Sequence, residues 1–142
     1  MMRGDVIKTA AEIFATASVV GGKESKGPLG NLFDLCDPCD RFGTKTWEKA
    51  ESEMQRMALN TALAKAERKA EDVGALFAGD LLNQCIGSSF PLRNTGVPHL
   101  GLYGACSTMA ESLLMASMTV DGGYAEKVVA MTSSHFASSE RQ

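Results

Sequence analysis

The segment over residues 107–120 constrains the fold most, because it reads as a helix that is apolar on most of its sides. Glu111 is the one charged residue within it. A helix of this kind is buried between two layers of structure. A chain of 142 residues seldom has enough material to cover such a helix on both sides. We therefore expect that a partner half is deleted from this chain or is supplied by another subunit. The apolar positions are Met109, Ala110, Leu113, Leu114, Ala116, Met118 and Val120.

The rest of the chain alternates between apolar runs and helical patterns. Further helices are predicted over residues 46–68 and 81–86, and a connector with helical turns near 91–93 follows over 87–98. Residues 21–45 read as a long irregular loop, since residues 21–43 hold five glycines and two prolines. Residues 133–142 show no further element. The alternation favours an α/β fold with a largely parallel sheet. Its strands are predicted over residues 11–20, 73–78, 99–103 and 127–132.

Composition excludes several classes of protein. The net charge of −3 gives no basic surface for nucleic acid. Residues 1–10 carry Arg3, Asp5 and Lys8, so we expect no signal peptide. The longest apolar stretch, near residues 113–120, is too short to cross a bilayer. The sequence thus predicts a soluble protein, or one attached to a membrane only peripherally, with reduced thiols.

The turn before the helix at 107–120 is the strongest candidate for a functional site. An apolar run ends in Gly104-Ala105 and delivers Cys106 to the start of that helix. The positive end of a helix dipole lowers a cysteine pKa from its free value of about 8.5 and also attracts anions. Cys106 is therefore either a nucleophile or part of an anion-binding turn, and a buried structural cysteine is the plain alternative.

Other motifs are weaker. Cys36-Asp37-Pro38-Cys39 has redox or zinc-like spacing but lacks a second ligand pair, so we expect no metal. The stretch from Gly22 to Pro28 fails the phosphate-loop pattern, because no lysine follows its last glycine. Asp80 follows a strand, where capping of the next helix is the simpler role.

His135 follows the strand predicted over residues 127–132. The carboxyl ends of parallel strands meet at one edge of a sheet. The side chain of His135 is therefore expected to converge with that of Cys106, although a lone histidine also has structural uses.

Eight stretches together resemble the stage V sporulation protein AD family, within the thiolase-like superfamily. The likeness runs from about residue 11 to the end. The stretches are Thr16-Ala-Ser-Val-Val-Gly21, Lys26-Gly-Pro-Leu-Gly30, Trp47-Glu-Lys-Ala-Glu-Ser52, Ala78-Gly-Asp-Leu-Leu-Asn-Gln84, Leu100-Gly-Leu-Tyr-Gly-Ala-Cys-Ser-Thr108, Val120-Asp-Gly-Gly123, Thr132-Ser-Ser-His135 and Glu140-Arg-Gln142.

The resemblance implies a thiolase-like fold. That fold has two βαβαβαββ halves, each with a mixed, mostly parallel sheet, and residues 1–142 look like the N-terminal half alone. The helix after Cys106 is then one of the buried helices. Thiolase-like enzymes place their nucleophile where Cys106 stands and take their catalytic bases from the second half. They dimerise through the strand that corresponds to about residues 98–103.

The resemblance also implies a function. The family is regarded as binding dipicolinic acid, alone or with calcium, and as loading it into the developing spore with other proteins of the same operon. The implied location is the forespore or spore, in solution or at the inner membrane. The ligand-binding residues would be Cys106, Ser107, Thr108, Ser134 and His135, with no catalytic residue, cofactor or metal. The alternative is an acyltransferase that uses Cys106 as nucleophile and coenzyme A as acyl carrier.

Overall fold

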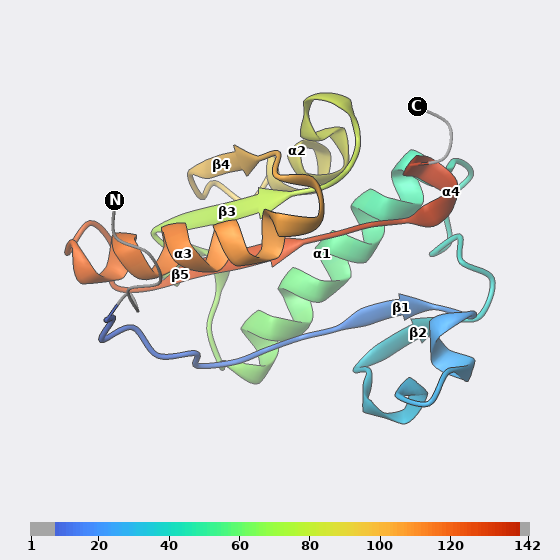
Figure 1. The fold of residues 1–142 in the computed structure, drawn as a ribbon, viewed down its shortest axis with the longest axis horizontal. Coiled ribbons are helices and arrows are strands. Elements are labelled where there is room, and N and C mark those ends of the chain that lie inside the picture. Colours follow the sequence, from blue (N-terminus) through green and yellow to red (C-terminus); the bar gives the residue numbers. More distant parts are fainter. Residues whose placement is uncertain (1–7, 140–142) are drawn as a thin grey trace, which may run out of the picture.

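The computed structural model describes residues 8–139. Residues 1–7 and 140–142, which include the Glu140-Arg-Gln142 stretch, lie outside this description. The described chain is a mixed α/β structure in which helices cover both faces of a parallel sheet (Figure 1). Its strands are β1 (Val19–Gly21), β2 (Leu35–Asp37), β3 (Ala75–Gly79), β4 (His99–Leu102) and β5 (Val128–Thr132). Its α-helices are α1 (Trp47–Lys65), α2 (Ile86–Leu92), α3 (Thr108–Asp121) and α4 (Phe136–Ser139).

The main sheet has the order β4-β3-β5, and both pairings are parallel. Every residue of the central strand β3 is buried. Because side chains alternate across a strand, Leu76 and Ala78 pack with α1 and α2. Ala75 and Phe77 face the other way and pack with Ala116 of α3. The predicted α/β class with parallel strands is confirmed.

The amino-terminal region departs from the prediction. Of the strand predicted over residues 11–20, β1 covers only Val19–Gly21, and residues 8–18 are extended chain without regular structure. The expected loop over residues 21–45 contains β2, which pairs in parallel with β1. Asp34 explains why this segment is ordered, because its carboxylate accepts hydrogen bonds from the Ser18 amide at 2.8 Å and from Lys65 at 2.6 Å.

The helices also differ from the prediction in two places. The helix expected over residues 81–86 is formed later, as α2 over Ile86–Leu92. Gln84 and Cys85 adopt positive φ angles of 57° and 52°, so the α-helix begins only after them. At the other end of the chain, α4 follows β5 where no element was expected.

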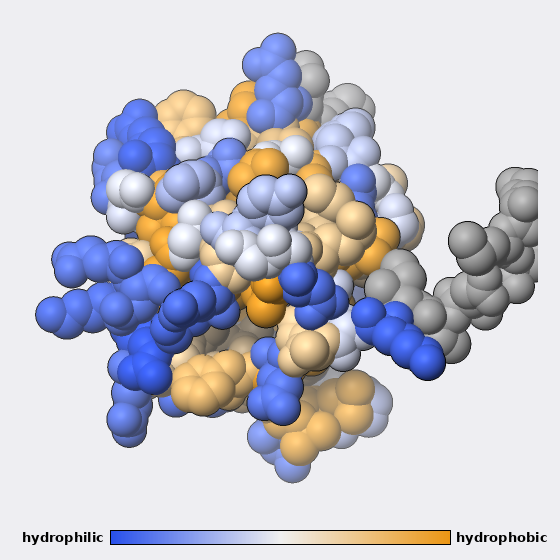
Figure 2. All heavy atoms as spheres, turned by 90° about the vertical axis from the view of Figure 1, so that its left-hand side faces the viewer, coloured by the Kyte–Doolittle hydropathy of each residue, from blue (hydrophilic) through white to orange (hydrophobic). Residues whose placement is uncertain are grey.

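The helix α3 is covered on one side only within residues 8–139. Its buried positions are Thr108, Ser112 and Ala116, which lie toward the sheet. The opposite face is apolar and exposed, with exposed fractions from 38% at Leu114 to 55% at Met118. Within residues 8–139 the helix thus has the sheet as one covering layer and no second layer over its apolar outer face, so the expectation of a partner half stays a prediction. Figure 2 shows apolar side chains also reaching the surface at the left-hand end of Figure 1, between hydrophilic ones.

None of the helices within residues 8–139 combines the length and the hydropathy that a membrane span requires.

Candidate functional site

The predicted site residues lie along the carboxyl edge of the main sheet. The strands β4, β3 and β5 end side by side at Leu102, Gly79 and Thr132. The turn that holds Cys106 follows β4, and Ser134 follows β5. These two strands flank β3, so their ends are separated by about 10 Å. The sheet order therefore places the two groups at opposite sides of one edge.

The turn between β4 and α3 presents the Cys106 thiol to solvent. Ala105, immediately before it, has a φ angle of 48°, a left-handed conformation that a residue with a Cβ adopts only under constraint. Ser107 is exposed too, and its hydroxyl donates to the carbonyl oxygen of Gly104 at 2.6 Å. The turn is thus a tight, internally bonded structure that exposes one thiol.

The start of α3 offers fewer unpaired amides than the sequence suggests. Residues Ala105–Ser107 form a 3-10 turn, in which the Ser107 amide donates to Gly104 at 3.0 Å and the Thr108 amide donates to Ala105. The Thr108 hydroxyl donates to Ala105 and accepts from the Gly104 amide at 3.1 Å. Thr108 is only 1% exposed, and the two hydrogen bonds of its buried hydroxyl hold the turn together.

His135 is held inside the protein by both ring nitrogens. Nε2 lies 2.8 Å from the carbonyl oxygen of Asp40, and Nδ1 accepts from the Ala137 amide at 3.3 Å. A carbonyl accepts and an amide donates, so these partners assign a ring proton to Nε2. The ring is 4% exposed and packs against Trp47 at 5.3 Å between centroids. His135 therefore fixes the chain after β5 against the loop at residue 40.

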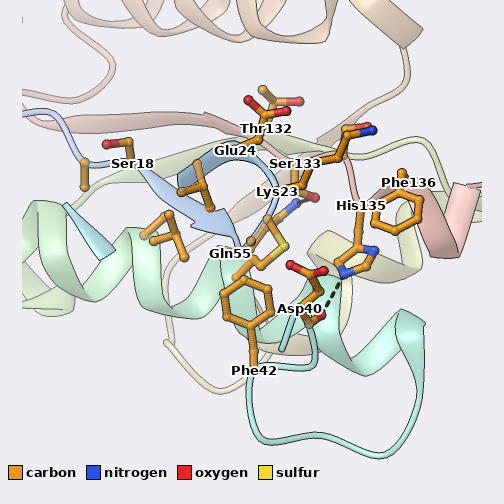
Figure 3. Close-up of a pocket in the computed structure, with 17 residues that line it drawn as sticks. Ser18, Lys23, Glu24, Asp40, Phe42, Gln55, Thr132, Ser133, His135 and Phe136 are labelled. Atoms are coloured by element: carbon orange, nitrogen blue, oxygen red, sulfur yellow. Dashed lines mark hydrogen bonds between the residues drawn. The ribbon is translucent and has the colours of Figure 1, made fainter. Parts of the chain in front are cut away.

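A cavity of about 490 Å³ lies between β1 and the end of β5, above α1 (Figure 3). Ser134 and His135 line it, whereas Cys106, Ser107 and Thr108 are not among its lining residues. The five predicted residues thus share an edge of the sheet but do not share this cavity. Other polar lining residues are Ser18, Lys23, Glu24, Asp40, Gln55, Thr132 and Ser133.

Two buried polar residues of α1 were not predicted from the sequence as part of the site. Glu51 is 0% exposed and Gln55 is 1% exposed, and both lie directly below the carboxyl edge of the sheet. Their four-residue spacing continues to the buried Leu59, so all three lie on one helix face. Their burial could have been predicted from this spacing, because it places two polar residues on the same helix face as a buried apolar one.

The four cysteines, all within residues 8–139, are free thiols. Cys36 and Cys39 are exposed, and the Cys39 thiol donates to the Asp37 carboxylate at 3.0 Å. This bond and the Cys39 amide hold the pKa of Asp37 below its ordinary value. Among the described residues, no group of three or more histidine, cysteine or acidic side chains is placed to hold a metal.

These observations define a mixed α/β protein with a parallel sheet and a thiol-bearing turn at its carboxyl edge. Its sequence matches the family model of Stage V sporulation protein AD over residues 3–142. It is also 42% identical, over 128 residues, to the Stage V sporulation protein AD of Bacillus subtilis (strain 168). The chain therefore belongs to the Stage V sporulation protein AD family, a family of sporulation proteins. The match covers 90% of this chain but 38% of that relative.

Proposed function

We propose that this chain is a thiolase-like half that binds dipicolinic acid during spore formation without catalysing a reaction. Membership of the sporulation family carries the proposal, because the match includes the Cys106 turn and the segment after β5. Apart from β2, which follows β1, and the short α4 at the end, the elements follow the order β1-α1-β3-α2-β4-α3-β5. This order supports the thiolase-like part, since it matches the expected βαβαβαββ order up to its last strand.

The proposed ligand suits the chemistry of the carboxyl edge. Dipicolinate carries two carboxylates on a flat aromatic ring, and carboxylates favour hydroxyl donors and the positive end of a helix. In this proposal Cys106 and Ser134 contact the ligand, because their side chains are exposed. Ser107 is exposed as well, and its hydroxyl exchanges its bond with the Gly104 carbonyl oxygen for one with a carboxylate of the ligand. Thr108 and His135 hold the two turns in place, because their polar atoms already have protein partners.

The proposal extends to partners and location. Calcium accompanying the ligand, other proteins of the same operon and a site at the spore inner membrane follow from the proposed role. A homodimer through residues 98–103 is part of it, since β4 lies at one edge of the main sheet and Leu100 is 44% exposed. A sheet edge of this kind offers backbone groups to a second copy.

Calorimetry with dipicolinate tests the binding proposal. Cys106→Ala and Ser134→Ala are expected to weaken binding about fivefold each, because each removes a polar contact. Cys36→Ala is the matched control, since it removes another exposed thiol away from the carboxyl edge. Isophthalate, which has the same carboxylates without the ring nitrogen, reports the contribution of that nitrogen. Absence of binding heat with the unaltered protein would reject the proposal.

Acyl transfer is the second candidate, favoured by the exposed Cys106 thiol after the strained Ala105. In that reaction the thiolate attacks the acyl carbonyl of an acyl-coenzyme A, forms a thioester and releases the coenzyme A thiol. Mass spectrometry after incubation with acetyl-coenzyme A would detect the added acetyl group. Its absence from the unaltered protein, under conditions in which Cys106 reacts with a simple alkylating reagent, would exclude this activity.

A further inference from the structure

At the carboxyl edge of the sheet, buried and half-buried polar side chains form a hydrogen-bonded network. Gln55 of α1 lies at its centre, and its Nε2 atom is 2.9 Å from Ser88 Oγ and 2.7 Å from Ser133 Oγ. Ser88 belongs to α2, whereas Ser133 follows β5. One side chain therefore bridges two segments that are separated by 45 positions in the sequence.

The direction of each hydrogen bond follows from the two carboxylates at the ends of this network, those of Asp80 and Glu51. Ser88 donates its hydroxyl proton to Asp80 at 2.5 Å, and Ser133 donates to Glu51 at 2.7 Å. Each serine oxygen is thus left as an acceptor, and the two N–H groups of Gln55 donate to Ser88, to Ser133 and, at the longer distance of 3.3 Å, to the carbonyl oxygen of Gly79. This assignment fixes the orientation of the Gln55 amide.

The hydrogen-bonded network continues to the end of β4. Asp80 also accepts from the amides of Leu82 at 2.8 Å and Ser88 at 2.7 Å, which shapes the loop over residues 80–88. In that loop the Cys85 thiol donates to the carbonyl oxygen of Leu102 at 3.3 Å. Leu102 is the last residue of β4, directly before the turn that carries Cys106. The hydrogen-bonded network therefore extends from the segment after β5 to the turn after β4.

Two energetically unfavourable features of this network indicate that it is retained for a function. The Gln55 Oε1 atom is buried and has no hydrogen-bond partner among the described residues. An unsatisfied buried acceptor is unfavourable, and an apolar side chain of similar size would avoid it. Gln84 and Cys85 hold left-handed backbone conformations in the same loop, and such residues persist only where their surroundings constrain them.

We propose that Gln55 is a positioning residue that couples the segment at residues 133–135 to the loop at 80–88 and, through it, to the Cys106 turn. The two exposed groups of the carboxyl edge are then held at a fixed separation by a side chain that touches neither. A ligand that orders one turn would order the other. The ligand-binding part of this inference rests on the proposed function, whereas the coupling itself does not.

Hydrogen exchange on the 142-residue chain tests the coupling. Ser88→Ala is expected to raise amide exchange at residues 133–135 about fivefold, since it removes the bond by which Gln55 is tied to α2. In a Gln55→Leu background the same substitution is expected to have no effect there, because the bridge is already absent. Ser89→Ala is the matched control, as Ser89 is the exposed neighbour of Ser88.

A second measurement uses the unaltered protein, so it does not depend on how well a variant folds. In its nitrogen-15 spectrum the two side-chain amide protons of Gln55 should exchange slowly with solvent. In the variants that fold, Ser88→Ala and Ser133→Ala should each shift the signal of a different one of these protons. Equal effects of Ser88→Ala in both backgrounds, or Gln55 amide protons that exchange as fast as those of exposed Asn60, would overturn the coupling.

Dipicolinate provides the third measurement. Gln55→Leu is expected to weaken its binding about fivefold, while Asn60→Leu on the exposed face of α1 leaves binding unchanged. If the unaltered protein binds no dipicolinate, the proposed function fails and the exchange experiment alone decides the coupling. If it binds and Gln55→Leu binds equally well, the positioning role is overturned.

Discussion

At the scale of single residues, the partner of a polar side chain decides its role. Thr108 and His135 have the chemistry of ligand-binding residues, yet the hydroxyl of one and the ring of the other are engaged by nearby backbone. Cys106 and Ser134 keep exposed side chains. The same logic separates the four cysteines, of which only Cys85 is buried.

Thiol labelling should distinguish these cysteines. Burial raises the pKa of Cys85, and the negative charge of Asp80 raises it further, so less of the reactive thiolate is present at any given pH. We expect Cys106, Cys36 and Cys39 to react with iodoacetamide at pH 8 at least about tenfold faster than Cys85. Peptide mass spectrometry over time measures the rates. Equal rates for Cys85 and Cys106 would contradict the structure.

Asp34 gives a residue-scale prediction about pH. Its hydrogen bond with Lys65, followed by that from the Ser18 amide, lowers its pKa from the ordinary value of 3.8. A lowered pKa means that the stabilisation is complete above pH 3.8 and is lost as the pH falls through the folded-state pKa. The Ser18 amide resonance should therefore change below pH 4. Asp34→Asn should remove that change, and a Ser18 titration that persists in this variant would contradict the assignment.

At the scale of elements, a capping residue in the local sequence decides where a helix begins, while the size of a side chain decides how closely two strands approach each other. α1 begins where Thr46 accepts from the Lys49 amide at 3.3 Å, as expected of a capping threonine. β3 and β4 approach each other at Gly79, where an added Cβ would overlap the Leu102 carbonyl oxygen and lie 2.5 Å from Thr108 Cγ2. A glycine here lets the strand and the start of α3 pack together.

Gly79→Ala should destabilise the protein by about 1–3 kcal/mol, because the methyl group overpacks a buried contact between β3, β4 and α3. Gly101→Ala on the neighbouring strand is the control, since its nearest atoms would lie 3.8 Å away. Urea unfolding of both variants gives the comparison. A Gly79→Ala protein as stable as Gly101→Ala would show that the strand ends can separate freely.

At the scale of the whole molecule, helices cover both faces of the sheet, but the outer side of α3 is uncovered within residues 8–139. The sheet side buries Ala116, whereas Leu113 and Met118 on other sides of the helix are 40% and 55% exposed. Exposed apolar surface of this kind is typical of places where one protein contacts another. The match to the Bacillus subtilis relative covers 38% of the length of that protein.

Substitutions along α3 should separate its two sides. Met118→Gln is expected to change the free energy of unfolding by less than about 0.5 kcal/mol and to reduce binding of an apolar dye. Ala116→Gln should cost about 2 kcal/mol or more, because it forces a polar side chain into the packed face. Thermal unfolding and dye fluorescence measure both effects. Equal destabilisation by the two changes would mean that the outer side is covered.

The regular elements were predictable from local patterns, and the exceptions have physical causes. The predicted positions of α1, β3, α3 and β5 agree with the structure to within a few residues. The strand predicted over residues 11–20 is mostly extended chain, because pairing with β2 begins only at Val19. The spacing of Glu51 and Gln55 places them on a buried helix face, but no local pattern shows that serines distant in the sequence bond to them.

The class of fold, the capping of α1, the parallel strands and the family can be predicted from the amino-acid sequence, because periodicity, turn residues and specific motifs are local properties. Which polar groups are engaged and which remain exposed depends on how the elements pack. His135 contacts Asp40 at a separation of 95 residues, and Ser133 contacts Glu51 at a separation of 82. Hydrogen-bond partners so distant in the sequence are brought together by packing alone, so no local pattern announces them.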